Sequence, residues 1–294
     1  MRLRTVLGIV CLLVLAGCGG SGPFVDGPSD GSGDPGTTPT VSPAPLPETT
    51  AEFPPGVSRR GVVAPERLAQ GHETTIANTS YTVRSNRTVV YANGSIRSLL
   101  VVEVALARNR TFLATAATAG PKAPVFLGVP PARATFWSNG SVYVRRFTAG
   151  GETTYNQYDP GQQFAGTWRY WTRTVPFGGR SGRPGSFYAG TFGAVTTRVT
   201  GRTTSGNASL VRLAGGGTRG SVQGTPLDGG GSLDAVRNVS LRATVGPRGV
   251  VRSLTVDYDA TADGRPVHVH WTVHYLAIGE TTVRRPPWFD RAVG

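Results

Sequence analysis

A cysteine at the end of a short apolar run is the residue of this chain best placed for covalent chemistry. Leu15-Ala16-Gly17-Cys18 overlaps the end of an apolar stretch that runs from Val6 to Ala16, and two arginines precede that stretch. Its 11 apolar residues are too few to span a bilayer, which needs about 20, but they suit a removable export signal. A cysteine directly after small residues at this place is typical of a lipobox, where the precursor is cut and the new first cysteine is lipidated. The pattern predicts a signal peptide over residues 1–17 and lipidation of Cys18.

The other cysteine, Cys11, lies inside the predicted signal and would be removed with it. Because Cys18 would be alkylated, the mature chain would have no free thiol for a disulfide or a thiolate metal site. We therefore expect a protein anchored to the cell membrane by lipid, on its extracytoplasmic face.

Asparagine is the second residue type that points to covalent modification. Of eight asparagines, all but Asn156 are followed two positions later by Ser or Thr without an intervening Pro. Since 54 of the 294 residues are Ser or Thr, about 1.5 such matches would arise by chance. Asn-Gly-Ser is also good turn chemistry, which accounts for two of the seven matches. The excess predicts N-glycosylation at several of Asn78, Asn86, Asn93, Asn109, Asn139, Asn207 and Asn238.

Three histidines share one face of a predicted C-terminal strand. In a strand, His268 and His270 would lie about 6.8 Å apart, while His274 would lie about 13 Å beyond His270. A shared metal ion is one interpretation, but polar residues on the solvent face of a half-buried strand are the favoured one. The sequence has no His-Glu-x-x-His, nucleophile elbow or phosphate loop, so we predict no catalytic residue, metal or cofactor and no enzyme activity.

Aromatic residues are concentrated in the middle of the chain. Ten of the 25 aromatic side chains lie between residues 155 and 192, with Arg169 and Arg173 among them. They could line a pocket for lipid tails or stack on sugar rings. The simpler interpretation, that they fill the core between a helix and a sheet, is favoured. The set comprises Tyr155, Tyr158, Phe164, Trp168, Tyr170, Trp171, Phe177, Phe187, Tyr188 and Phe192.

Charge and composition divide the chain after the signal. Residues 19–57 contain 8 Gly, 9 Pro and 9 Ser or Thr among 39 positions and have a net charge of −5. Residues 58–294 carry 28 basic and 12 acidic residues, a net charge of +16. We predict a disordered linker over residues 18–57 and a single β-rich extracytoplasmic domain over residues 58–294. An exported basic domain would meet acidic envelope glycoprotein or lipid headgroups, and we predict no nucleic-acid partner. The favoured interpretation of the charge is a dispersed, solvated arginine-rich surface that reflects a GC-rich genome.

The domain begins with a predicted helix and continues as antiparallel strands. Pro65 and Glu66 suit a helix N-terminus, and the helix is expected to end near Asn78. From Ser80 the apolar residues alternate, which predicts a strand, and Asn93-Gly94 predicts a tight hairpin turn. Residues 95–107 are the predicted partner strand, and residues 110–117 a third strand.

The same pattern recurs further along the chain. A second hairpin is predicted over residues 135–147, a third over 236–258, and a last strand over 267–276. Residues 185–200 are expected to form one helical face, and the Gly-rich residues 215–231 a mobile loop. The expected fold is α+β, with a large curved, half-barrel-like antiparallel sheet and one or two helices packed on it.

With these features in view, the chain resembles an uncharacterised family of haloarchaeal surface lipoproteins. The resemblance rests on the lipobox, the Thr/Pro/Gly linker, Tyr81-Thr-Val-Arg with Tyr91-Ala-Asn-Gly, and Ile278-Gly-Glu-Thr-Thr-Val-Arg-Arg-Pro-Pro-Trp288. It covers most of the mature chain. The basic domain is a departure, because proteins of salt-loving archaea are usually strongly acidic.

In outline the layout is also similar to lipoprotein-carrier and lipid-carrier folds, in which an incompletely closed sheet holds helices over an apolar cavity. This resemblance implies a lipid-anchored surface protein that binds a lipid or other apolar ligand in a sheet-lined cavity. The alternative is a structural or adhesion lipoprotein with a packed core that docks on acidic envelope polymer.

Overall fold

A computed structural model describes residues 53–159, 166–178, 184–206 and 208–294. All of them belong to one compact unit, Thr50–Gly294. Cys18, the signal, most of the linker and Asn207 lie outside the described residues. No helix within the described ranges is long and apolar enough to cross a membrane.

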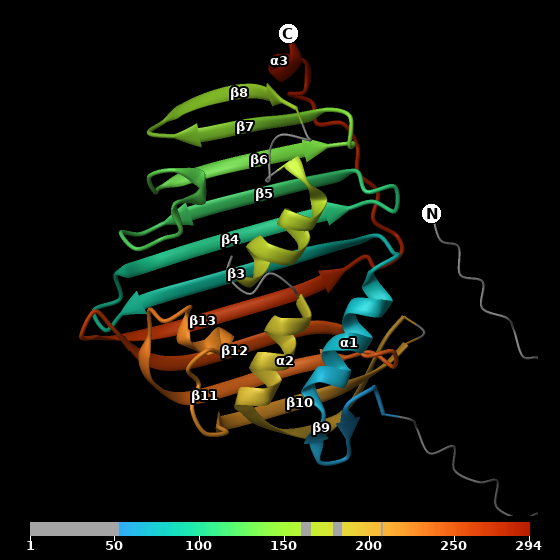
Figure 1. The fold of residues 1–294 in the computed structure, drawn as a ribbon, viewed down its shortest axis with the longest axis vertical. Helices are drawn as coiled ribbons and strands as arrows, with labels where there is room; N and C mark the ends of the chain where they lie inside the picture. Colours follow the sequence, from blue (N-terminus) through green and yellow to red (C-terminus); the bar gives the residue numbers. More distant parts are fainter. Residues whose placement is uncertain (1–52, 160–165, 179–183, 207) are drawn as a thin grey trace, which may run out of the picture. The chain divides into compact units, whose positions relative to one another are not determined.

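One antiparallel sheet of 11 strands dominates the unit (Figure 1), which confirms the predicted α+β class and the large curved sheet. Its strands run in the order β8-β7-β6-β5-β4-β3-β13-β12-β11-β10-β9. The sheet is open, with β8 and β9 as its edges. The strands are β3 (Tyr81–Tyr91), β4 (Ile96–Leu106), β5 (Phe112–Ala119), β6 (Ala132–Ser138), β7 (Tyr143–Ala149), β8 (Glu152–Tyr158), β9 (Val195–Ser205), β10 (Ala208–Thr218), β11 (Asp234–Val245), β12 (Val251–Ala262) and β13 (Arg265–Leu276).

Tight turns join several pairs of strands that are neighbours both in the sheet and in the chain. Gly94 between β3 and β4 has a φ of 80°, and Asp263 and Gly264 between β12 and β13 have φ values of 51° and 71°. These conformations are the ones that short hairpin turns require, and Asn, Asp and Gly adopt them most easily. The predicted hairpins over residues 81–107, 135–147 and 236–258 are confirmed.

Helices cover one face of this sheet, which we call the helix side (Figure 1). They are α1 (Pro65–Ile76), α2 (Pro184–Ala194) and the short η3 (Tyr170–Thr174) and η4 (Val175–Phe177). Two further short turns are η1 (Val125–Leu127) and η5 (Pro226–Asp228), and a small second sheet pairs β1 (Val57–Ser58) with β2 (Gly61–Val62). The helix predicted from Pro65 to about Asn78 is therefore confirmed.

Two predictions about the middle of the chain are wrong in part. The helix expected over residues 185–200 ends at Ala194, because Val195-Thr196-Thr197 are β-branched and extend as β9. The loop expected over residues 215–231 begins late, because β10 continues to Thr218. A Cβ at Gly215 would lie 2.8 Å from the Thr196 carbonyl oxygen, so glycine here permits close pairing of β9 and β10.

The C-terminal segment lies on the face opposite the helices. After β13 the chain runs along the sheet to α3 (Asp290–Val293), beside β7 and β8 (Figure 1). Trp288 joins Trp137 and Val144 in a small buried cluster there, separate from the main core. This segment holds Ile278 to Trp288, one of the motifs that carried the family resemblance.

Candidate ligand-binding cleft

Small side chains lie on the helix side of β5 and β6, next to the aromatic residues that line a cleft. Ala116 of β5 pairs with Ala134 of β6, and Ala114 pairs with Phe136. The side chains of Ala114, Ala116 and Ala134 are almost completely buried, so other groups cover them. Because alanine projects only one carbon from the sheet, this part of the helix side leaves room for bulky groups above it.

Aromatic side chains from three strands and one short helix build the walls. Phe136 and Tyr143 have ring centroids 6.0 Å apart with an interplanar angle of 8°, and Tyr158 lies 5.7 Å from Tyr143. Trp171 of η3 lies over Phe136 with centroids 4.3 Å apart. Such rings offer large rigid apolar surfaces to a ligand.

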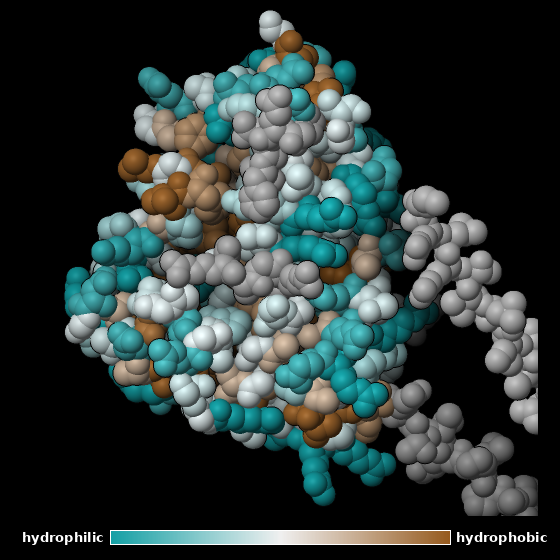
Figure 2. Space-filling view, in the orientation of Figure 1, coloured by the Kyte–Doolittle hydropathy of each residue, from teal (hydrophilic) through white to brown (hydrophobic). Residues whose placement is uncertain are grey.

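The cleft between these walls has a volume of about 530 Å³. Its lining residues are Phe126, Leu127, Gly128, Phe136, Tyr143, Arg145, Phe147, Tyr158, Tyr170 and Trp171. The η1 turn forms one lip and leaves apolar side chains in solvent, with Val125 74%, Val129 84% and Phe126 37% exposed. Figure 2 shows hydrophobic side chains gathered where this turn lies, beside β5 and β6. An exposed apolar lip next to an aromatic cleft is typical of an entrance for an apolar ligand.

One charged residue, Arg145, lies among these rings. Its guanidinium lies 5.2 Å from the ring centroids of both Phe147 and Tyr158 and donates to the Asn156 Oδ1 at 3.0 Å. Burial raises the pKa of the Tyr143 phenol above its usual value, and the nearby Arg145 charge opposes this only in part. The phenol is therefore neutral at physiological pH, and the cleft wall carries no anion from it.

The aromatic segment of the sequence divides between the two roles proposed for it. The core contains Phe177, Phe187, Tyr188 and Phe192. The cleft is lined by Tyr158 and Tyr170, and Trp171 belongs to both the core and the cleft lining. Phe164 lies outside the described residues.

Sequence reasoning did not single out half of the cleft, namely Phe126, Leu127, Phe136, Tyr143 and Phe147. The alternation of Tyr143, Arg145 and Phe147 placed them on one face of a hairpin. Nothing local showed that this was the face toward Trp171.

The three histidines of β13 lie on the opposite face and do not converge. His268 Nδ1 is 3.0 Å from Asp259, and His270 Nδ1 is 2.6 Å from Asp257, so each pairs with its own carboxylate on β12. Burial lowers the pKa of His274, with a smaller contribution from the charge of Arg84. Among the described residues no three His, Cys, Asp or Glu side chains come together as metal ligands would.

The predicted glycosylation residues occupy surface positions. Asn78, Asn93, Asn109, Asn139 and Asn238 are exposed, and Asn86 is half-buried. Asn86 has the opposite parity on β3 to the buried residues Val83, Ser85 and Val89, so it lies on the face of the strand away from the core.

Comparison with known proteins gives likenesses to solved structures alone. No protein-family model matches the chain, and no curated protein does. LprF from Mycobacterium bovis aligns with a TM-score of 0.37 at 12% identity, covering 76% of this chain and 96% of that one. Lipoprotein LppX from Mycobacterium tuberculosis aligns with a TM-score of 0.35 at 9% identity, covering 75% and 97%.

A LolA superfamily protein from Nitrosomonas europaea aligns with a TM-score of 0.23 at 8% identity, covering 76% of this chain and 96% of that one. Scores and identities this low carry no argument about what this chain binds.

Proposed function

We propose that this protein is a lipid-anchored, extracytoplasmic binding protein whose cleft holds the hydrocarbon part of a lipid or a similar apolar ligand. One observation carries the proposal, which is the cleft of about 530 Å³ with aromatic walls and an exposed apolar lip. Ligand sites of small molecules range from about 300 to 1,000 Å³ and are mostly apolar.

The energetic argument favours a hydrocarbon chain. Each buried CH₂ group contributes about 0.8 kcal/mol, so a chain with eight buried carbons gains roughly 6 kcal/mol before the cost of association. A sugar would need several polar partners besides the rings. The charged side chain in the lining, Arg145, already donates to Asn156.

The lipobox and linker support the anchoring part of the proposal. Lipidation of Cys18 would hold the chain at the membrane. The linker up to residue 57, taken as a flexible coil, would span roughly 35 Å. A tether of that reach would let the cleft approach the lipid surface while the domain stays in solvent.

The cleft can be tested with an uncharged fluorescent probe, N-phenylnaphthylamine, added to the full chain carrying Cys18→Ser to keep it in solution. Phe126→Glu places a charge on the cleft lip, so we expect about tenfold weaker probe binding. Val63→Glu is the matched control, because Val63 is an exposed valine (61%) that belongs neither to the lining of the cleft nor to its lip. Equal binding by Phe126→Glu and Val63→Glu would overturn the proposal.

The alternative, docking on acidic envelope polymer, stays a prediction that rests on the net charge of +16 over residues 58–294. It requires binding that weakens steeply as salt rises, since exposed charges are screened. Probe binding in the cleft should instead change little with salt.

A further inference from the structure

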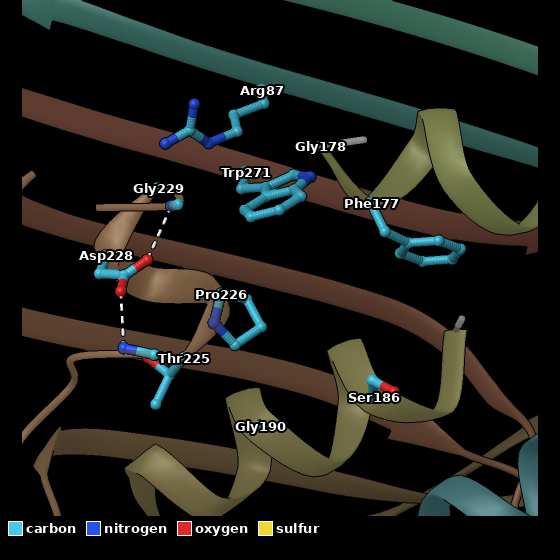
Figure 3. Close-up of a pocket in the computed structure, with 12 residues that line it drawn as sticks. Arg87, Phe177, Gly178, Ser186, Gly190, Thr225, Pro226, Asp228, Gly229 and Trp271 are labelled. Atoms are coloured by element: carbon cyan, nitrogen blue, oxygen red, sulfur yellow. Dashed lines mark hydrogen bonds between the residues drawn. The ribbon is translucent and has the colours of Figure 1, made fainter. Parts of the chain in front are cut away.

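A second cavity lies on the helix side, away from the aromatic cleft. It has a volume of about 480 Å³ and lies where β3 and β13 pass beneath η4, α2 and η5. Figure 3 shows Arg87 and Trp271 from the strands facing Phe177, Pro226 and Asp228 across this space. None of the residues that line it also lines the aromatic cleft.

Arg87 is an unusual residue for its place in the sheet. It shares the helix side of β3 with Val83, Ser85 and Val89, which are all buried. Its register partner is Trp271 of β13, and its guanidinium lies 5.3 Å from the centroid of that ring. A positive charge is thus held against an apolar surface, at a position where the strand pattern calls for a core residue.

The guanidinium of Arg87 has donors that the described residues leave unused. Its Nε and Nη2 atoms are buried, and no hydrogen bond of good geometry satisfies them among the described residues. None of the described ion pairs includes Arg87. An unpartnered buried donor destabilises the folded protein, and more so when the group is charged.

The nearest candidates for a counterion inside the chain do not neutralise it. Asp228 lines the same cavity (Figure 3). Its carboxylate is engaged elsewhere, because it accepts hydrogen bonds from the backbone amides of Gly224 at 2.6 Å, Gly230 at 2.7 Å and Gly231 at 3.2 Å. Tyr258 interacts with Arg87, whose charge and weak side-chain hydrogen bond lower the pKa of the phenol. Burial is the larger effect and raises that pKa, so Tyr258 is neutral and supplies no anion. The charge of Arg87 is left without an anion of its own.

We propose that this cavity binds an oxyanion, a phosphate or carboxylate group, with the Arg87 guanidinium as its principal partner. The planar fork of arginine donors fits two oxygens of such a group. Phe177 and Trp271 provide apolar wall next to the charge, so the cavity also suits an anionic headgroup with the start of a hydrocarbon chain. Free phosphate and the headgroup of a single-chain amphiphile present the same oxyanion chemistry.

Isothermal titration calorimetry on the full chain with Cys18→Ser separates these sources. We expect dodecyl phosphate to bind, and Arg87→Gln to weaken its binding by a factor of ten or more. Inorganic phosphate binding with the same Arg87 dependence would support the site and identify a free ion as the ligand. If binding requires dodecyl phosphate, the ligand is an amphiphile.

Variants keep the test decisive. Arg242→Gln removes the same charge from a side chain that is 73% exposed, and it should leave affinity within twofold of the parent. Arg87→Met keeps apolar packing on Trp271, so it serves if Arg87→Gln does not fold. The proposal would be overturned if neither dodecyl phosphate nor inorganic phosphate binds the parent protein. It would also be overturned if Arg87→Gln and Arg87→Met bind them as tightly as the parent does.

The two sites can fail separately. Phe126→Glu should alter binding of the uncharged probe and leave phosphate binding unchanged, whereas Arg87→Gln should do the reverse. If only one of the two substitutions has its expected effect, the site that contains the other residue is wrong.

Discussion

At the scale of single residues, His72 shows how burial sets a protonation state. It lies on α1, fully buried, and its Nδ1 accepts the backbone N–H of Val251 at 3.1 Å. The rings of Tyr188 and Tyr275 lie 4.6 and 4.8 Å away in edge-on contact. Burial lowers the pKa of His72 to about 3, so the imidazole is neutral and ties the helix to β12.

This predicts a pH dependence of stability. The folded-state pKa of His72 lies below its unfolded value near 6.5, so its contribution is complete above pH 6.5 and is lost as pH falls toward 3. We expect the wild type to lose up to about 1.4 kcal/mol of unfolding free energy per pH unit in that window, relative to His72→Asn. Urea unfolding between pH 7 and 4 measures the difference, and parallel curves for the two proteins would contradict it.

The hydrogen bonds of the sequon asparagines rank them as glycosylation sites. The amide oxygens of Asn93, Asn109 and Asn139 accept backbone N–H groups, while the nitrogen is the atom that carries a sugar. The Asn238 nitrogen instead donates to Asp259 at 2.8 Å. We expect higher occupancy at Asn93, Asn109 and Asn139 than at Asn238, measured by glycopeptide mass spectrometry of the native protein. The reverse order would mean that the folded structure does not govern modification.

At the scale of elements, the C-terminal segment works as a strap on the face opposite the helices. Trp288 lies 6.2 Å from the ring of Tyr155 on β8, and Phe289 packs edge-on against Trp137 at 5.3 Å. The strap therefore covers β6, β7 and β8, the same strands whose other face forms the aromatic cleft. The strap thus packs against the strands of the cleft on the face that is opposite the cleft.

Trp288→Ala tests the strap. Removing a buried tryptophan should lower the free energy of unfolding by about 3 kcal/mol. Hydrogen exchange should rise mainly in β7 and β8, because the loss is local to that end of the sheet. Val293→Ala is the control, since that side chain is 40% exposed and should cost little. Equal exchange along the whole sheet in Trp288→Ala would show that the strap is not a local support.

At the scale of the whole molecule, the expected role depends on the domain remaining near a membrane. The compact unit Thr50–Gly294 contains both cavities, and Cys18 precedes it by a linker. Cys18→Ser should move the full chain from the membrane fraction to the soluble fraction, because the lipid would be missing. Cys11→Ser is the control and should stay with the membrane. Retention of Cys18→Ser would show that the lipobox interpretation is wrong.

The sequence by itself determined the features that depend on near neighbours. Alternation placed β3, β4, β11, β12 and β13, and Asn93-Gly94 located a hairpin, because side-chain period and turn conformation are local properties. It missed β9 and β10 as strands, since threonine, arginine and glycine there give weak alternation. The β10 glycines are useful only once β9 lies against them.

The tertiary structure alone decided both candidate sites. The aromatic cleft needs Trp171 of η3 to lie over Phe136 of β6, which are 35 positions apart in the chain. Sequence reasoning did not single out Arg87, although it shares the core-facing parity of Val83 and Val89 on β3. That its charge has no counterion among the described residues follows only from where η5 and Asp228 lie. Cavities and unpaired charges are properties of packing between distant segments, and no local pattern encodes them.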